Sequence, residues 1–123
     1  MRRRSALVVD DAGFIRFLMA TCLKRQGFSS IYMAGDGVEA LERLSEHLPD
    51  VIFTDFNMPN MSGGDFVAKV RSNPAFAHIP VVLLSSVDFS PDDWLSLGFT
   101  NYIRKPFTGL ELNQAISRLS VWR

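Results

Sequence analysis

The stretch DVIFTDFNMP, residues 50–59, decides the fold. A mostly apolar run at residues 50–54 leads directly into a carboxylate, Asp55, and Pro59 closes the segment. A short apolar run that does not alternate with polar residues is typical of a strand covered on both faces, as in a parallel sheet. The acid is therefore predicted to lie at the end of a buried strand. A charged side chain in that position needs an explanation in terms of function.

Four further runs have the length and composition of strands. They are ALVV at 6–9, SIYMA at 30–34, PVVLLS at 80–85 and NYI at 101–103. With residues 50–54 they make five predicted strands. Each run is followed by a segment with helical spacing of its apolar residues.

Helix start signals mark these segments. A helix is predicted over residues 13–27, ending at Gly27, and later helices begin at the N-cap candidates Asp36, Ser62, Ser90 and Thr108. Pro91 follows Ser90, and Thr108 with Glu111 forms a predicted capping box. The predicted inward positions are Ile15, Leu18, Met19, Cys22; Val38, Leu41, Leu44, Leu48; Phe66, Val67, Val70; and Leu112, Ala115, Ile116, Leu119.

Strand and helix thus alternate five times, which predicts a single α/β domain over residues 1–123. Its five-stranded parallel sheet has helices on both faces, because crossovers between parallel strands are right-handed. In such sheets a ligand binds outside the carboxyl ends of the strands.

The amino-acid composition disfavours several functional classes of protein. Thirteen basic and thirteen acidic residues give zero net charge, which does not favour a nucleic-acid binder. The first apolar run is too short for a signal peptide or a membrane span. A single cysteine, Cys22, excludes an internal disulfide and suits a reducing compartment, so we expect a cytoplasmic protein without membrane insertion.

The predicted carboxyl edge of the sheet gathers charged and hydroxyl groups. The first strand delivers Asp10 and Asp11, the third Asp55, the fourth Ser85, and the fifth is followed by Lys105. Clustered carboxylates repel each other unless a cation lies between them, and an all-oxygen site suits Mg²⁺ or a similar divalent cation such as Mn²⁺.

A magnesium site alone gives no role to the hydroxyl of Ser85 or to Lys105. An anion would use both groups. A carboxylate beside a metal, a hydroxyl and a lysine can attack phosphorus and form an aspartyl phosphate. Asp55, held at the end of a rigid strand, is the predicted nucleophile.

Four motifs give the chain a resemblance to the receiver domain of two-component response regulators. They are VVDD at 8–11, DFNMPNMSG at 55–63, LLSS at 83–86 and YIRKPF at 102–107. Each motif is weak alone, but all four occur in order at predicted strand ends. The resemblance implies a flavodoxin-like receiver fold with strand order 2-1-3-4-5.

The resemblance also implies a role for each matching residue at the site. Asp55 corresponds to the phosphoacceptor. Asp10 and Asp11 correspond to Mg²⁺ ligands, Asp11 more directly and Asp10 partly through water. The backbone carbonyl of Asn57 would be a further ligand, and Lys105 corresponds to the family's lysine.

A second group of residues corresponds to the family's switch. Ser85 occupies the hydroxyl position, here serine where threonine is more usual, and Tyr102 occupies the switch aromatic position. The implied partners are a histidine kinase or histidine phosphotransfer protein and an unknown downstream protein. The latter would bind the face of the fourth helix, fifth strand and fifth helix, where we expect Trp94 and Phe89.

The sequence departs from the family pattern between Ser85 and Lys105. This segment is slightly short, which predicts a trimmed loop or a short fourth helix, and Phe99 follows a glycine where a small residue is common. Trp94 either fills a groove between helices or is exposed for a partner. His47 and His78 are interpreted as surface residues, and Cys22 as core.

Three alternatives to a single-domain phosphoacceptor stay open. A phosphatase of the haloacid dehalogenase type also uses a nucleophilic Asp with Mg²⁺. Such an enzyme requires a second acid two residues later, where this chain has Asn57. An interaction module that has lost phosphorylation is disfavoured because all the site residues are present. The chain could also be the receiver fragment of a longer regulator with an output domain.

Overall fold

The computed structural model describes residues 4–119, so the predicted domain boundaries at 1 and 123 lie outside the described residues. Five parallel strands form one sheet in the order β2-β1-β3-β4-β5. The strands are β1 (Arg4–Val9), β2 (Phe28–Ala34), β3 (Val51–Asp55), β4 (Val81–Ser85) and β5 (Asn101–Arg104). The predicted fold class, strand positions and strand order are confirmed.

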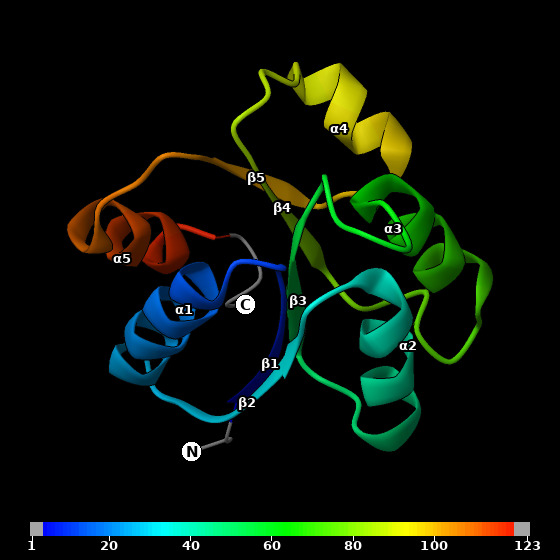
Figure 1. Ribbon diagram of the computed structural model, residues 1–123, viewed down its shortest axis with the longest axis horizontal. Helices are drawn as coiled ribbons and strands as arrows, with labels where there is room; N and C mark the ends of the chain where they lie inside the picture. The colour runs from blue at the N-terminus through cyan, green and yellow to red at the C-terminus, as the bar shows by residue number, and fades with distance from the viewer. Residues whose placement is uncertain (1–3, 120–123) are drawn as a thin grey trace.

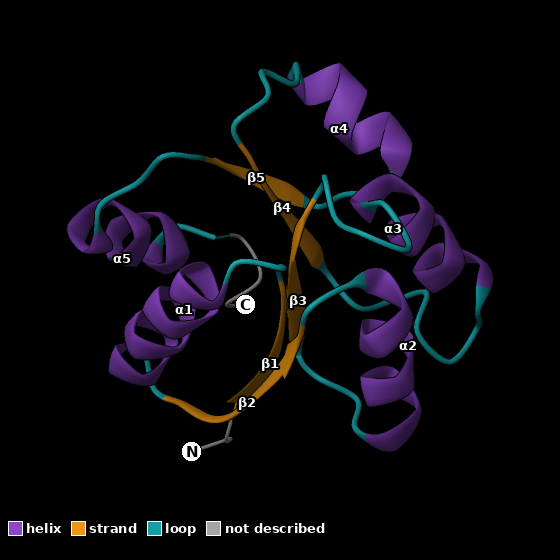
Figure 2. Cartoon of the chain, in the orientation of Figure 1, coloured by secondary structure: helices purple, strands orange, loops and turns teal. Residues whose placement is uncertain are grey.

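Five helices alternate with the strands, as predicted (Figure 2). They are α1 (Gly13–Arg25), α2 (Gly37–Glu46), α3 (Gly63–Ser72), α4 (Pro91–Leu97) and α5 (Gly109–Ser117). All four predicted N-caps accept a hydrogen bond from the backbone of the third helical residue, and the Thr108–Glu111 capping box is present. Among the helices of the described chain, α4 is the shortest, with seven residues.

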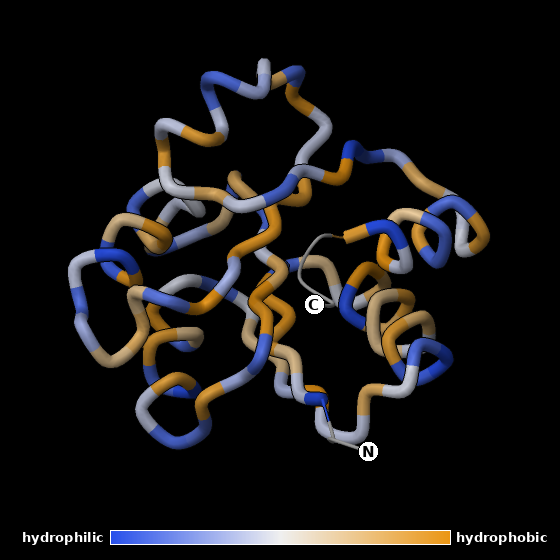
Figure 3. The backbone as a smooth tube through the Cα atoms, turned by 180° about the vertical axis from the view of Figure 1, so that it is seen from behind, coloured by the Kyte–Doolittle hydropathy of each residue, from blue (hydrophilic) through white to orange (hydrophobic). Residues whose placement is uncertain are grey.

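The sheet separates two apolar layers. Helices α1 and α5 cover one face, and α2 and α3 cover the other, with α4 outermost beyond α3 (Figure 1). The backbone is most apolar along the central strands, whereas α4 alternates between polar and apolar residues (Figure 3). Strands β3 and β4 are buried from both sides, which is why residues 51–54 and 81–85 are continuously apolar or small.

Two predicted core positions of α2 are wrong. Val38 is 45% exposed and Leu48 is 59% exposed. Leu48 lies beyond the end of the helix, where the C-cap is His47. Val38 is displaced because Gly37 and Ala40 take the inward positions of the first turn, and the absence of a side chain at Gly37 lets Met61 approach to within 2.9 Å of where a Cβ would lie.

The remaining core predictions are confirmed with small differences. Met19, Cys22, Leu44, Phe66, Val67, Val70, Leu112, Ile116 and Leu119 are buried, whereas Ile15, Leu18, Leu41 and Ala115 are partly buried. His47 and His78 are exposed, as predicted. Among residues 4–119, no helix is both long and apolar enough to cross a membrane.

Candidate functional site

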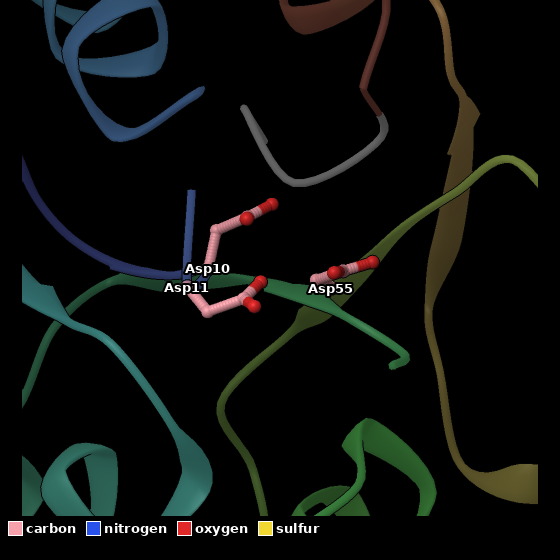
Figure 4. Close-up of side chains that lie close together, drawn as sticks. All are labelled: Asp10, Asp11 and Asp55. Carbon is pink, nitrogen blue, oxygen red and sulfur yellow. The ribbon is translucent and has the colours of Figure 1, made fainter. Parts of the chain in front are cut away.

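The register of the sheet brings Asp10 and Asp55 together. Val9 of β1 pairs with Thr54 of β3, and each acid is the next residue along the chain. Figure 4 shows Asp10, Asp11 and Asp55 close together where β1 and β3 end. On the other side of β3, Ser85 of β4 pairs with Arg104, so Lys105 follows at the same edge. The predicted gathering of the three acids and Lys105 is confirmed.

Asp10 is completely buried, and both of its carboxylate oxygens are hydrogen-bonded. Oδ1 accepts a hydrogen bond from the backbone N–H of Ala12 at 2.9 Å, and Oδ2 accepts one from Lys105 Nζ at 2.7 Å. A buried carboxylate needs such partners, because an unpaired charge inside a protein is very costly. Asp10 is therefore held in one orientation at the base of the site.

Asp55 is more accessible, with 14% of its side chain exposed. Its Oδ1 accepts a hydrogen bond from the backbone N–H of Phe56 at 2.9 Å and lies 3.5 Å from Lys105 Nζ. Burial raises the pKa of Asp55; Lys105 and the Phe56 N–H oppose that change, and the charge of Asp10 adds to it. The second oxygen, Oδ2, accepts no hydrogen bond from the described residues, so a reacting group can approach it.

Lys105 links the two acids. Its side chain is 18% exposed, and its ammonium group is within 4 Å of both Asp10 and Asp55. Its backbone N–H donates to the carbonyl oxygen of Ser85 at 2.8 Å, and the bond to Pro106 is cis. The ammonium of Lys105 offsets only part of the charge of three carboxylates, which leaves the site with excess negative charge.

Asp11 completes a group of three acids whose oxygens lie within 4.8 Å of one another. It is exposed and forms no hydrogen bond with any residue between 4 and 119, so its carboxylate is available to a ligand. An all-carboxylate cluster with one acid free and one fixed in place is chemically suited to a hard divalent cation such as Mg²⁺. Asn57 lies in the loop two residues after Asp55, with its side chain exposed; the role of its carbonyl stays a prediction.

Ser85 and Tyr102 are connected through the loop after β4. Ser85 is buried, and its Oγ accepts a hydrogen bond from Val87 N–H at 3.0 Å. The hydroxyl of Tyr102 donates to the carbonyl oxygen of Val87 at 2.5 Å. The N–H of Val87 is therefore hydrogen-bonded to Ser85 and its carbonyl oxygen to Tyr102. The switch role of these two residues stays a prediction.

Two residues that position the site were not identified from the sequence. The guanidinium of Arg16 donates to the backbone oxygen of Asp10 at 2.6 Å, fixing the turn after β1. Gly63 packs directly on the main chain of Asp55 and Phe56, and a Cβ there would lie only 2.8 Å from the Cα of Phe56. The glycine pair after the cap Ser62 was the available signal for this close approach.

Comparisons with known proteins agree with this geometry. The family model described as the response regulator receiver domain matches residues 6–117. The chemotaxis protein CheY1 of Helicobacter pylori is 38% identical over 113 residues, which cover 89% of this chain and 91% of that protein. The sensor histidine kinase TmoS of Ectopseudomonas mendocina is 38% identical over 118 residues, but these cover only 12% of the kinase.

A solved structure supports the same assignment. The chemotaxis response regulator CheY4 of Vibrio cholerae superimposes with a TM-score of 0.86 at 31% identity, covering 96% of this chain and 99% of that one. Both the sequence and the arrangement of strands and helices are therefore shared along nearly the whole chain. The chain belongs to the family of response regulator receiver domains of two-component signalling systems.

Proposed function

We propose that Asp55 accepts a phosphoryl group from a phosphohistidine, with Mg²⁺ as cofactor. The observation that carries this proposal is the position of Lys105, whose ammonium group lies 2.7 Å from Asp10 and 3.5 Å from Asp55 in a cluster of three acids. A structural ion pair would need one acid. Three acids with a lysine and an accessible Asp55 oxygen fit a site that receives both a divalent cation and an anion.

The transfer is a displacement at phosphorus. The Asp55 oxygen forms the O–P bond while the P–N bond to the donor histidine breaks, and the leaving ring nitrogen keeps the electron pair of that bond. Lys105 is close enough to Asp55 to stabilise charge on the phosphoryl oxygens. The hydroxyl of Ser85 accepts from Val87 N–H and keeps its own proton, which it can donate to a phosphoryl oxygen.

Asp11, Asp10 and Asp55 would hold the cation, with the backbone carbonyl of Asn57 as a further ligand. Bound Mg²⁺ would neutralise charge on the carboxylates and on the phosphoryl oxygens. Because both Asp10 oxygens already accept hydrogen bonds, Asp11 would be the more direct ligand and Asp10 would act partly through water.

We further propose that the chain acts as one receiver domain, residues 1–123, in the cytoplasm. A histidine kinase or histidine phosphotransfer protein is the donor, and a downstream protein binds the face of α4, β5 and α5. The chain is itself the substrate of the transfer and not an enzyme for a separate metabolite. The half-buried Trp94 gives the α4 part of that face an apolar side chain.

A phosphatase of the haloacid dehalogenase type is less well supported. Such an enzyme needs an acid two residues after the nucleophile to donate and accept a proton. The amide of Asn57 has no titratable proton at that position. The family assignment also favours the phosphoacceptor.

The proposal is tested by intact-mass measurement after incubation with phosphoramidate and Mg²⁺. We expect one added phosphoryl group on the wild type and on Asp92→Asn, which removes an exposed acid of α4 outside the three-acid cluster. Asp55→Asn should take up none, and EDTA should block uptake by the wild type. Undiminished uptake by Asp55→Asn, or by the wild type in EDTA, would contradict the proposal.

A further inference from the structure

Three aromatic rings form a row that begins next to Asp55 and ends at Tyr102. The rings of Phe56 and Phe89 have centroids 5.1 Å apart at an interplanar angle of 53°, and those of Phe89 and Tyr102 lie 6.2 Å apart at 78°. Both distances fall in the range at which tilted aromatic rings attract each other. Phe89, which the sequence led us to expect on the outer face, is half-buried between two other rings.

The first ring is fixed to the phosphorylation site. The backbone N–H of Phe56 donates to Asp55 Oδ1, and the Phe56 carbonyl accepts from Gly63 N–H at 2.7 Å. Its ring also lies against α3, because a Cβ on Gly64 would be 3.2 Å from Phe56 Cε1. A change in the position of the Asp55 carboxylate therefore acts directly on the residue that carries this ring.

The other end of the row is fixed to the loop after β4. Tyr102 donates to the Val87 carbonyl, two residues before Phe89. Asp88 of the loop and Arg104 of β5 also form an ion pair. Both side chains are mostly exposed, so this pair contributes little to stability. Phe89 is thus the one side chain of this loop that touches both the residue after Asp55 and the proposed switch tyrosine.

Helix α4, which follows this loop, makes little contact with the core. No side chain in residues 91–97 is fully buried and only Trp94 packs partly against the core, so α4 restrains the loop through little core packing. The arrangement of the loop depends instead on the hydrogen bonds of Val87 and on the packing of Phe89.

We propose that Phe89 is a positioning residue that couples the phosphorylation state of Asp55 to Tyr102 through the ring of Phe56. The proposal rests on the proposed function of Asp55. It adds an aromatic connection to the polar one through Ser85, Val87 and Tyr102. Phosphorylation moves Phe56 and Ser85 together, and the loop changes its arrangement only when both connections transmit that movement.

The test uses amide NMR of the full chain, with and without beryllofluoride and Mg²⁺, the fluoride complex standing in for a phosphoryl group on Asp55. Four variants are compared with the wild type: Phe89→Ala, Phe89→Leu, Phe89→Tyr and, as a control, Leu95→Ala. Phe89→Leu keeps an apolar side chain without a ring and serves if Phe89→Ala does not fold. Leu95→Ala removes an exposed apolar side chain of α4 that is outside the row.

We expect all four variants to be phosphorylated on Asp55 as the wild type is. The shift change at the Tyr102 amide should fall about twofold or more in Phe89→Ala and Phe89→Leu. It should be retained in Phe89→Tyr and Leu95→Ala, because the ring is present in both. A merely structural role of Phe89 would lower stability without separating phosphorylation from the Tyr102 response.

Two failures are distinguishable. If the wild type is not phosphorylated on Asp55, the proposed function is wrong and this inference falls with it. If the wild type is phosphorylated and Phe89→Leu shows the full Tyr102 response, the row of rings does not couple the two sites, and the inference alone is overturned.

Discussion

The carboxyl ends of β1 and β3 differ sharply from the segment formed by the β4–α4 loop and α4. Asp10 is completely buried with both oxygens bonded, and the strand residues before Asp55 are buried on both faces. In α4, residues 91–97 contribute no buried side chain, and only Trp94 packs partly against the core. The proposed phosphorylation site thus lies on the well-packed strand ends. The proposed response lies in the β4–α4 loop and α4, where little core packing opposes opening.

The largest expected effect comes from a comparison of two leucines, one in β4 and one in α4. Leu83 is fully buried in β4, and its replacement by Ala leaves a cavity, so we expect a loss of about 2–5 kcal/mol in the free energy of unfolding. Leu95 is 54% exposed on α4, and Leu95→Ala should change stability by about 0.5 kcal/mol or less. Urea unfolding measures both. Equal losses would mean that α4 is part of the cooperative core.

Divalent metal should stabilise the rigid site because three clustered carboxylates repel each other without a cation. Mg²⁺ at ten times its dissociation constant would add about 1.4 kcal/mol to the free energy of unfolding. Thermal melts with and without Mg²⁺ measure this gain. Asp11→Ala should abolish it, and a gain that survives in the variant would place the cation elsewhere.

Two helix caps with the same geometry stand at the starts of α3 and α4. The Oγ of Ser62 accepts from Asp65 N–H at 3.1 Å at the start of α3, and the Oγ of Ser90 accepts from Asp93 N–H at 3.1 Å at the start of α4. Loss of such a cap costs about 1 kcal/mol. We expect Ser62→Ala to lower global stability, because Phe66, Val67 and Val70 of α3 are buried.

Ser90→Ala should instead speed amide hydrogen exchange within α4 and leave the unfolding midpoint nearly unchanged. The cap energy is the same, but opening of α4 exposes no fully buried side chain and only the partly packed Trp94. A drop in global stability as large as that of Ser62→Ala would show that α4 does not open on its own.

The smallest expected effect concerns the charge of Asp55. Burial raises its pKa in the folded protein, so the folded state binds this proton more tightly than the unfolded chain does. Stability is therefore lost as the pH rises through the carboxyl range. Without metal, Asp55→Asn should melt slightly higher than the wild type at pH 7, and the gain should shrink near about pH 4.

The exposed acid Asp92 supplies the matched control, because Asp92→Asn should show no such gain. If Asp55→Asn melts lower than the wild type at pH 7, the ionised carboxylate stabilises the metal-free fold, and burial does not raise the pKa of Asp55.

The sequence predicted those features that depend on local signals or on the geometry of a parallel sheet. The caps Asp36, Ser62, Ser90 and Thr108 are local, because a side chain bonds to the backbone three residues later. The meeting of Asp10, Asp55 and Lys105 followed from the rule that parallel strands end at the same edge. These predictions needed no knowledge of packing.

Other features could not be predicted in this way. Which carboxylate oxygen Lys105 contacts depends on the course of the chain after β5, 95 residues from Asp10. The position of Phe89 between Phe56 and Tyr102 depends on how the β4–α4 loop folds back, and loop packing has no sequence period. Val38 was misplaced because the inward positions in the first turn of α2 go to the small residues Gly37 and Ala40.

The most direct test of a rigid phosphoacceptor site coupled to α4 is the map of amide shift changes when Mg²⁺ and beryllofluoride are added to the wild type. We predict large changes around Asp55 and along the β4–α4 loop, α4 and β5, and small changes in β2 and α2. Asp55→Asn should show none of the beryllofluoride-dependent changes. Changes confined to the immediate surroundings of Asp55, or the same map in Asp55→Asn, would contradict a rigid phosphoacceptor site read out by a loosely held α4.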